Sequence, residues 1–165
     1  MSAVVLRGDQ EWMKTVSKHP GEEIVYVRLD EKGFEAAKPG DPVFLAQDKG
    51  MNWEIYGMAV FNRVESMTIP QTLAVYGSRC GFTDEYEFIA FILRHAEDKA
   101  LRLDKDSVLR NLVLEQFQAV TKRGRREIRD AVGACFKQAT NSVKKLEEEN
   151  LIATITKIIN DNQQK

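Results

Sequence analysis

The stretch "KPGDPVFLAQDKGMNWEIYGMAVFNRV", residues 38–64, decides the fold. It opens on a tight Pro-Gly-Asp turn, runs into a short apolar strand at 42–47, and continues in a longer strand at 53–67. Two alternating sets of side chains in the longer strand are both partly apolar: Ile55, Gly57, Ala59 and Phe61 against Tyr56, Met58, Val60 and Asn62. This pattern is typical of a strand in a closed barrel with a helix outside it.

The segments before this stretch alternate between strand and helix. Apolar and β-branched residues predict strands at 3–8 and 23–30. Between them the pattern predicts a helix at 9–19, with Asp9 as its N-cap and Pro-Gly ending it. Residues 31–42 are expected to form a short helical turn that ends at the Pro-Gly-Asp turn.

The segments after it predict two helices and one more strand. Pro70 suits the first turn of a helix that ends at Gly77, and Thr83 is the expected N-cap of the next helix. The connection "GSRCG" joins these helices, and its glycines allow backbone conformations that other residues resist. After an irregular segment at 95–106, the run at 107–120 fits a strand or a helix, and its compact apolar centre favours a closing strand.

From about residue 125 the apolar period becomes helical. The stripe that predicts the first of two helices is Ile128, Val132, Cys135, Ala139, Val143 and Leu146. The stripe of the second helix is Leu151, Ile155, Ile158 and Asn162. We therefore expect two units, a mixed domain at 1–121 and a helical extension at 122–165.

Composition and charge limit the function classes. The chain has 165 residues, 43% of them hydrophobic, and no apolar run near the ~20 residues that span a bilayer, which predicts a globular protein with a real core. The first residues lack the features of a secretion signal, so we expect a cytoplasmic location and reduced Cys80 and Cys135. The net charge of −1 hides a basic cluster, "TKRGRREIR" at 121–129, with five cations and one Glu.

Three segments in this order resemble the PUA-like superfamily, which includes the PUA, ASCH and EVE domains. They are the turn and strand "KPGDPVFL" at 38–45, the pair Tyr56-Gly57, and "YGSRCGFTDEYEFIAF" at 76–91. The resemblance covers roughly residues 3–120. It implies an α+β fold with a mixed, partly closed β-barrel and flanking helices, followed here by the helical extension. It also implies RNA or DNA binding, with recognition of a flipped or modified base in a barrel cleft.

Aromatic side chains are the candidates for stacking on such a base. They are Trp12, Phe44, Trp53 and Tyr76. Trp53 is the most suggestive, because Lys49 and Asn52 lie beside it in a Gly-containing segment between two strands. The alternative is structural: Trp53 would cover one end of the barrel, and Trp12 would belong to the core or the edge of a groove.

Ser78 and Arg79 lie in the connection between helices, where backbone N–H groups and a guanidinium could face a phosphate or a base edge. The alternative for Arg79 is a surface ion pair with Asp84 or Glu85. Cys80 is expected to be a small core residue, because neither histidine is near it in sequence.

Lys49 and the basic cluster supply the candidates for phosphate contacts, and the residues of the cluster are Lys122, Arg123, Arg125, Arg126 and Arg129. Cations at the start of a helix oppose its dipole at a cost of ~0.3–1 kcal/mol each, which favours an anionic partner. The alternative is a solvated surface balanced by Glu127 and Asp130.

The first hypothesis is thus a non-catalytic module that binds nucleic acid. A second makes the C-terminal helices a homo- or hetero-oligomer seam, which requires an apolar tail stripe that faces water. A third is an ASCH-like hydrolase of modified nucleosides, with Lys14, Thr15 and Glu54 as candidates. The family's "G-x-K-x-x-T" segment is absent, since Lys14 and Thr15 are adjacent, and this argues against that activity. The spacings predict no metal site, cofactor or Ser-His-Asp signature.

Overall fold

A computed structural model describes residues 2–7, 10–29, 34–35, 37–49, 52–95, 100–132 and 143–163. Its elements, in chain order, are β1 (Ala3–Arg7), α1 (Gln10–Val16), β2 (Ile24–Arg28), β3 (Pro42–Lys49), β4 (Asn52–Thr68), α2 (Ile69–Tyr76), the 3-10 helix η1 (Gly77–Cys80), α3 (Glu85–His95), β5 (Val108–Ala119), α4 (Lys122–Val132), β6 (Val143–Leu146) and α5 (Glu149–Asn162). The predicted α+β class is confirmed.

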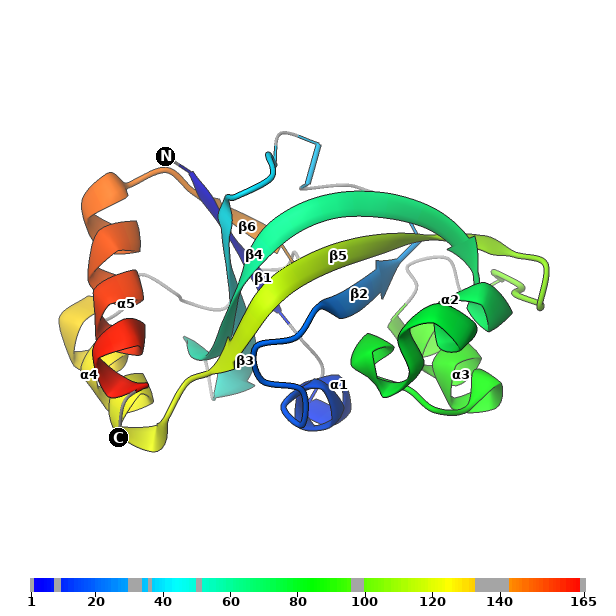
Figure 1. The fold of residues 1–165 in the computed structure, drawn as a ribbon, viewed down its shortest axis with the longest axis horizontal. Helices are drawn as coiled ribbons and strands as arrows, with labels where there is room; N and C mark the ends of the chain where they lie inside the picture. The colour runs from blue at the N-terminus through cyan, green and yellow to red at the C-terminus, as the bar shows by residue number, and fades with distance from the viewer. Residues whose placement is uncertain are drawn as a thin grey trace.

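One sheet organises the molecule. It has six strands in the order β2-β5-β4-β3-β1-β6, in which β1 and β3 are parallel and the other pairs are antiparallel. The long strands β4 and β5 curve across it side by side (Figure 1). Within the described ranges no pairing links the edge strands β2 and β6, so the sheet is open and the predicted barrel closure is not confirmed.

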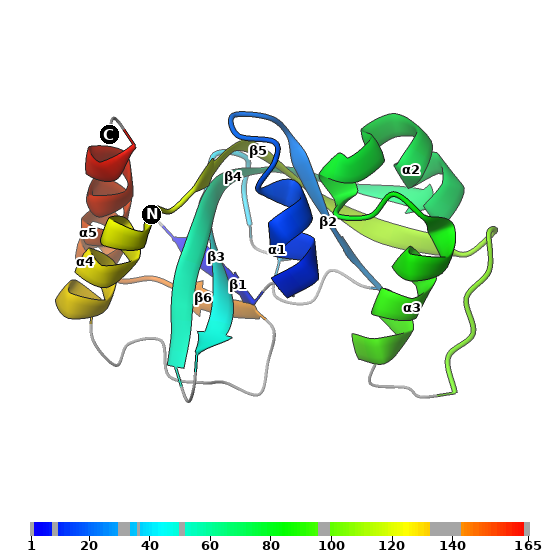
Figure 2. The ribbon, with the colours of Figure 1, turned by 90° about the horizontal axis from the view of Figure 1, so that it is seen from below.

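Both faces of the sheet are covered, which explains the apolar residues on both faces of its strands. On β1, Val4 and Leu6 belong to the core that includes residues of α1, α2 and α3, whereas Ala3 and Val5 face the core beneath α4 and α5. Figures 1 and 2 place α4 and α5 at one end of the molecule and α2 and α3 at the other, with α1 between them.

The prediction that the first helix of the tail extends to Leu146 is wrong. Residues 143–146 form β6, which pairs with β1 in the register Ala3 to Leu146 and Leu6 to Val143. The apolar spacing of this segment fits either element, and the open edge of β1 decides in favour of a strand because it offers unpaired backbone groups. Cys135 and Ala139 lie outside the described residues. The boundary between 121 and 122 stays a prediction.

The tail packs on the sheet instead of facing water. Val132 and Ile155 are buried against Phe44 and Val5, and Ile158 packs against the same cluster. The side chain of Val143 lies outside the described residues. The described apolar stripe is therefore covered within the chain, which removes the observation that the oligomer hypothesis requires.

The predicted helix starts are nearly right. Thr68 caps α2: its hydroxyl accepts from the backbone of Gln71, whose side chain accepts from the Thr68 backbone in return. The expected cap Thr83 is wrong by one residue, because the Asp84 carboxylate accepts from the backbone N–H groups of Tyr86 and Glu87 at 2.6 and 3.4 Å. A carboxylate at this position also complements the helix dipole, which favours it over a hydroxyl.

The indole of Trp12 joins three parts of the fold. It is 1% exposed, its Nε1 donates to the carbonyl of Val25 on β2 at 3.2 Å, and its ring meets Tyr26 edge-on at 5.1 Å. Gly81, which ends η1 at a φ of 91°, lies so close that an added Cβ would overlap the indole. Trp12 is therefore a core residue, as the structural alternative expected, and its ring is not available to stack on a base in this structure.

We expect Gly81→Ala to lower the free energy of unfolding by about 2–4 kcal/mol, because alanine resists the left-handed φ and its Cβ overlaps a buried ring. Urea denaturation measures the loss. Gly40→Ala is the control, since Gly40 has a φ of 98° but nothing within 4 Å of an added Cβ, so only the ~1 kcal/mol of backbone strain applies. Equal losses in the two variants would contradict the packing of Gly81 on Trp12.

Candidate functional site

The connection "YGSRCG" lies beside the turn that follows α1. Helix η1 contacts both α1 and β2. The turn is fixed to β5 by two backbone hydrogen bonds, from Gly21 N–H to the Phe117 carbonyl at 2.6 Å and from Phe117 N–H to the Glu22 carbonyl at 3.2 Å. Two polar networks form where the turn and η1 meet.

The first network links a serine, a histidine and a glutamate. The hydroxyl of Ser78 lies 2.7 Å from Nε2 of His19, and Nδ1 of His19 lies 2.8 Å from Oε2 of Glu22. Because an ionised carboxylate only accepts hydrogen bonds, Nδ1 carries the proton in the neutral ring and Nε2 accepts from Ser78. The arrangement is the one in which a serine hydroxyl can lose its proton to an imidazole.

The sequence contains no local signal for this network. Ser78 and His19 are 59 positions apart, and no Ser-His-Asp motif connects them. The turn through Pro20 and Gly21 is the one visible hint, since it returns Glu22 to His19 three positions later. From the sequence, the histidines are considered only as partners of Cys80, and the structure instead places His19 beside Ser78.

The second network surrounds Tyr76. Its hydroxyl donates to the carboxylate of Glu65 and accepts from Arg63 at 3.4 Å. Arg63 also forms ion pairs with Glu65 at 3.5 Å and with Glu23 at 3.6 Å. Burial, the hydrogen bond to Glu65 and the charge of Glu65 raise the pKa of Tyr76 to about 12. The ring is 4% exposed, so the predicted stacking of a base on its face is not available in this structure.

Arg79 satisfies backbone carbonyl groups at the end of α2. Its guanidinium donates to the carbonyls of Val75 at 3.2 Å, Tyr76 at 3.3 Å and Glu23 at 3.4 Å, and lies 5.3 Å from the centre of the Tyr76 ring. Cations commonly complete the last turn of a helix in this way. In the described part of the chain no ion pair joins Arg79 to Asp84 or Glu85, so that alternative is wrong.

Cys80 is a core residue, as predicted. It is fully buried, and burial raises the pKa of its thiol, which moves it away from the reactive thiolate.

We expect the Tyr76 hydroxyl to stabilise the fold below pH ~10 and to lose this effect as the pH rises through about 12, because the folded state holds the proton more tightly than the unfolded state. The difference in free energy of unfolding between wild type and Tyr76→Phe should therefore shrink over that range. Urea denaturation at several pH values measures it. A constant difference from pH ~8 to ~12 would contradict the network.

The aromatic residues predicted to form a base pocket are described only in part. Phe44 is fully buried under α4 and α5, so its predicted role at a ligand is wrong. The backbone of Trp53 pairs with Asp48, and that of Asn52 with Lys49, at the end of the β3–β4 hairpin. The side chains of Trp53, Asn52 and Lys49 lie outside the described residues, and their roles stay predictions.

Helix α4 separates its cations by face. Gly124, Ile128 and Val132 form its buried side. Lys122, Arg126 and Arg129 are exposed and recur at i, i+4 and i+7, which places them together on the opposite side. We call these three residues the α4 cation strip. Among the described residues none of the three forms an ion pair, and exposed Asp130 borders the strip.

The other two cations of the cluster have partners. Arg123 donates to Glu127 at 3.0 Å. This ion pair between positions i and i+4 is the one expected if the basic cluster is an ordinary solvated helix surface. Arg125 donates to the carbonyl of Val120 at 2.9 Å, lies 4.6 Å above the ring of Tyr56, and pairs with Glu54 at 3.9 Å. Arg125 is therefore held by contacts within the chain, and its predicted contact with phosphate stays a prediction.

Because Glu54 is only 8% exposed, we expect Arg125→Ala to lower the free energy of unfolding by about 2 kcal/mol, since it removes the cation beside a buried carboxylate. Arg126→Ala is the matched control from the exposed side of the same helix, where the change should stay within ~0.5 kcal/mol. Thermal and urea unfolding compare the two. Equal effects would contradict the division of α4 into structural and exposed cations.

The residues of the hydrolase hypothesis are not brought together around a substrate. Glu54 faces Arg125 of α4, whereas Lys14 and Thr15 lie on α1, where the Thr15 hydroxyl donates to the carbonyl of Glu11 at 3.1 Å. The described residues contain no group of acids, histidines and cysteines that could hold a metal ion. No described helix has the length and apolar character needed to cross a membrane.

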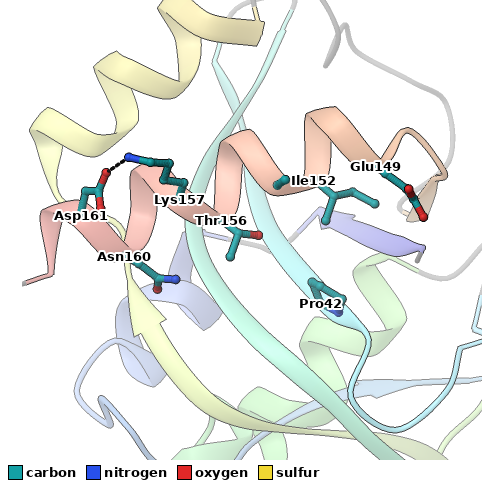
Figure 3. Close-up of a pocket in the computed structure, with 8 residues that line it drawn as sticks. Pro42, Glu149, Ile152, Thr156, Lys157, Asn160 and Asp161 are labelled. Carbon is teal, nitrogen blue, oxygen red and sulfur yellow. Dashed lines mark hydrogen bonds and ion pairs between the residues drawn. The ribbon is translucent and has the colours of Figure 1, made fainter.

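A hollow of about 730 Å³ runs along α5. Its lining includes Pro42 at the start of β3 and, on α5, Glu149 near one end and the ion pair of Lys157 with Asp161 near the other (Figure 3). None of the residues predicted to bind a ligand lines it.

The comparisons with known proteins identify the fold. No protein-family model matches the chain, and no curated protein matches it. The solved structure of ASCH from Zymomonas mobilis is similar, with a TM-score of 0.56 at 12% identity over 94% of both chains. A single-residue mutant of that protein reaches a TM-score of 0.58 at 12% identity, over 93% of this chain and 96% of that one. The protein thus has the PUA-like, ASCH-type fold that the sequence motifs predicted.

Proposed function

We propose that this ASCH-type fold binds the phosphate backbone of a nucleic acid through the α4 cation strip. The observation that carries the proposal is the exposure of Lys122, Arg126 and Arg129 on one side of a helix whose other side is buried. Three parallel cationic side chains match a row of phosphates, and release of counterions from the polyanion supplies the driving force.

The position of the strip strengthens the argument. Its cations begin in the first turn of α4, which contains no acidic residue, and Thr121 caps this turn by accepting from Gly124 N–H at 3.0 Å. Cations at this end of a helix are unfavourable by ~0.3–1 kcal/mol each, and a bound polyanion relieves that repulsion. Arg125 makes contacts within the chain, and the three exposed cations of the strip form no ion pair among the described residues. Three cations are enough to contact a phosphate backbone. The strip contains no aromatic side chain that could recognise a base.

A base-holding role for Trp53, with Asn52 and Lys49 beside it, remains part of the proposal as a second contact. The two sets of residues would have different roles. The α4 cation strip would bind any strand, whereas the ring of Trp53 would discriminate among bases. RNA and DNA, single- and double-stranded, are equally compatible with phosphate contacts alone.

We expect the double variant Arg126→Glu with Arg129→Glu to weaken binding at least ~10-fold at low salt and to reduce the salt slope by about 2, because two phosphate contacts are lost. Labelled single- and double-stranded RNA and DNA, titrated at several salt concentrations, measure both quantities. The loss should be similar for every sequence tested.

Arg102→Glu with Lys105→Glu is the matched control. Both residues are exposed in the segment before β5, which lies at the far end of the sheet from α4, and the double change alters the net charge by the same amount. Binding by this control should stay within about twofold of wild type. Equal loss of affinity in the two double variants would mean that the effect comes from net charge and not from the α4 cation strip, which would contradict the proposal. Absence of salt-dependent binding in the wild type would also overturn it.

A further inference from the structure

The network of Ser78, His19 and Glu22 has no part in phosphate binding by α4, because α4 lies at one end of the molecule, away from α1 and the turn that follows it (Figure 1). We propose that it is a second, catalytic site: Ser78 is a nucleophile, His19 is its general base, Glu22 is a positioning residue, and the substrates are carboxylic esters. The site uses none of Lys14, Thr15 and Glu54.

The distances suit proton transfer. At 2.7 Å, the Ser78 hydroxyl is within hydrogen-bond reach of Nε2 of His19, the first requirement for a general base and its nucleophile. At 2.8 Å, Glu22 holds the proton on Nδ1 and stabilises the imidazolium that forms when His19 accepts a proton. Serine, histidine and acid therefore occur in the order that the chemistry requires.

Each of the three residues is held by backbone contacts, so the alignment is built into the fold. His19 N–H donates to the Val16 carbonyl at 2.9 Å at the end of α1, and the Glu22 carbonyl accepts from Phe117 of β5 at 3.2 Å. The Ser78 carbonyl accepts from Gly81 N–H at 3.0 Å, beside the Trp12 indole. A nucleophile and base held in place in this way need no rearrangement before reaction.

The exposure of the site indicates the class of substrate. Ser78 is half-buried, and the His19 and Glu22 side chains beside it are 21% and 51% exposed, so the network borders solvent and a substrate there gains little binding energy from burial. Such a site favours a substrate with a good leaving group. Esters meet this requirement better than amides, because an alkoxide or phenoxide leaves more readily than an amine anion.

The reaction balances with water alone. The Ser78 oxygen attacks the acyl carbon and its proton passes to Nε2 of His19, after which the bond from the acyl carbon to the leaving oxygen breaks and His19 returns the proton to that oxygen. Water then attacks the acyl-serine with His19 as base, the bond to the Ser78 oxygen breaks, and the carboxylic acid and free serine are produced.

A fluorophosphonate probe tests the nucleophile directly, because Ser78 would displace fluoride and keep the phosphonyl group as a stable adduct. We expect the full-length protein to be labelled at Ser78, located by peptide mass spectrometry, and to hydrolyse p-nitrophenyl acetate. His19→Gln should slow both reactions about 100-fold, the usual contribution of a general base. Ser78→Ala should abolish the label.

Ser17→Ala is the matched control, since the Ser17 hydroxyl is also partly buried in this region but donates to the Met13 carbonyl at 2.6 Å and not to an imidazole. It should be labelled as fast as wild type. Thermal unfolding identifies any variant that has lost its fold, and His19→Gln keeps the test valid if Ser78→Ala fails to fold. A wild type that is not labelled at Ser78, or equal labelling of wild type and His19→Gln, would overturn the proposal.

Glu22→Gln tests positioning separately from stability. The chain has two histidines, so the proton NMR signal of the His19 Nδ1–H bonded to a carboxylate is readily assigned. The variant should lose this signal and label more slowly than wild type, with an unchanged unfolding temperature. Retention of the signal and of the labelling rate would remove Glu22 from the site.

Discussion

The buried indole of Trp12 is the contact on which the arrangement of the site depends. It joins α1 to β2 through the hydrogen bond to Val25, and it lies against Gly81 at the end of η1. Only a residue without a Cβ can approach the ring so closely, and the left-handed backbone at that position also favours glycine. The consequence is that the turn after α1, which carries His19, and the start of η1, which carries Ser78, lie side by side.

The two proposed sites differ in whether their polar side chains are paired with one another or exposed. Around η1, the charged and polar groups are paired with one another in networks that fix the positions of Ser78, Tyr76 and Arg79. On α4, Arg125 pairs with Glu54, and the cations on the opposite side of the helix are exposed. Paired groups suit chemistry that needs fixed geometry, whereas exposed cations suit a flexible polyanion. The cations of α4 lie at one end of the molecule, away from α1 and the turn that follows it, so the two sites can operate independently (Figure 1).

The sequence was a good guide to local structure and a poor one to long-range contacts. Strands, turns and most helices follow from patterns within a few residues, as in the alternation of β4 and the place of Pro70 in the first turn of α2. The strand at Val143–Leu146 was mistaken for helix because its pairing partner, β1, lies at the other end of the chain. The same limit applies to the site: the sequence marks Ser78 only as a candidate for contact with a phosphate or a base, because its contact with His19, 59 positions away, is a product of tertiary packing. Phe44 was predicted to be a ligand residue although its ring is buried, because an aromatic residue in a sequence does not show whether its ring is buried.

The central claim is that the Trp12 indole is buried and hydrogen-bonded and connects α1 to β2 and η1. Hydrogen exchange of its Nε1 proton tests this most directly. The chain contains two tryptophans, and Trp12→Phe assigns the signal. If the account is right, the Trp12 indole proton exchanges only through global unfolding, with a protection that matches the free energy measured by denaturation. Exchange at the rate of an exposed indole would contradict the account, because α1 would then lack its anchor and His19 would have no fixed position beside Ser78.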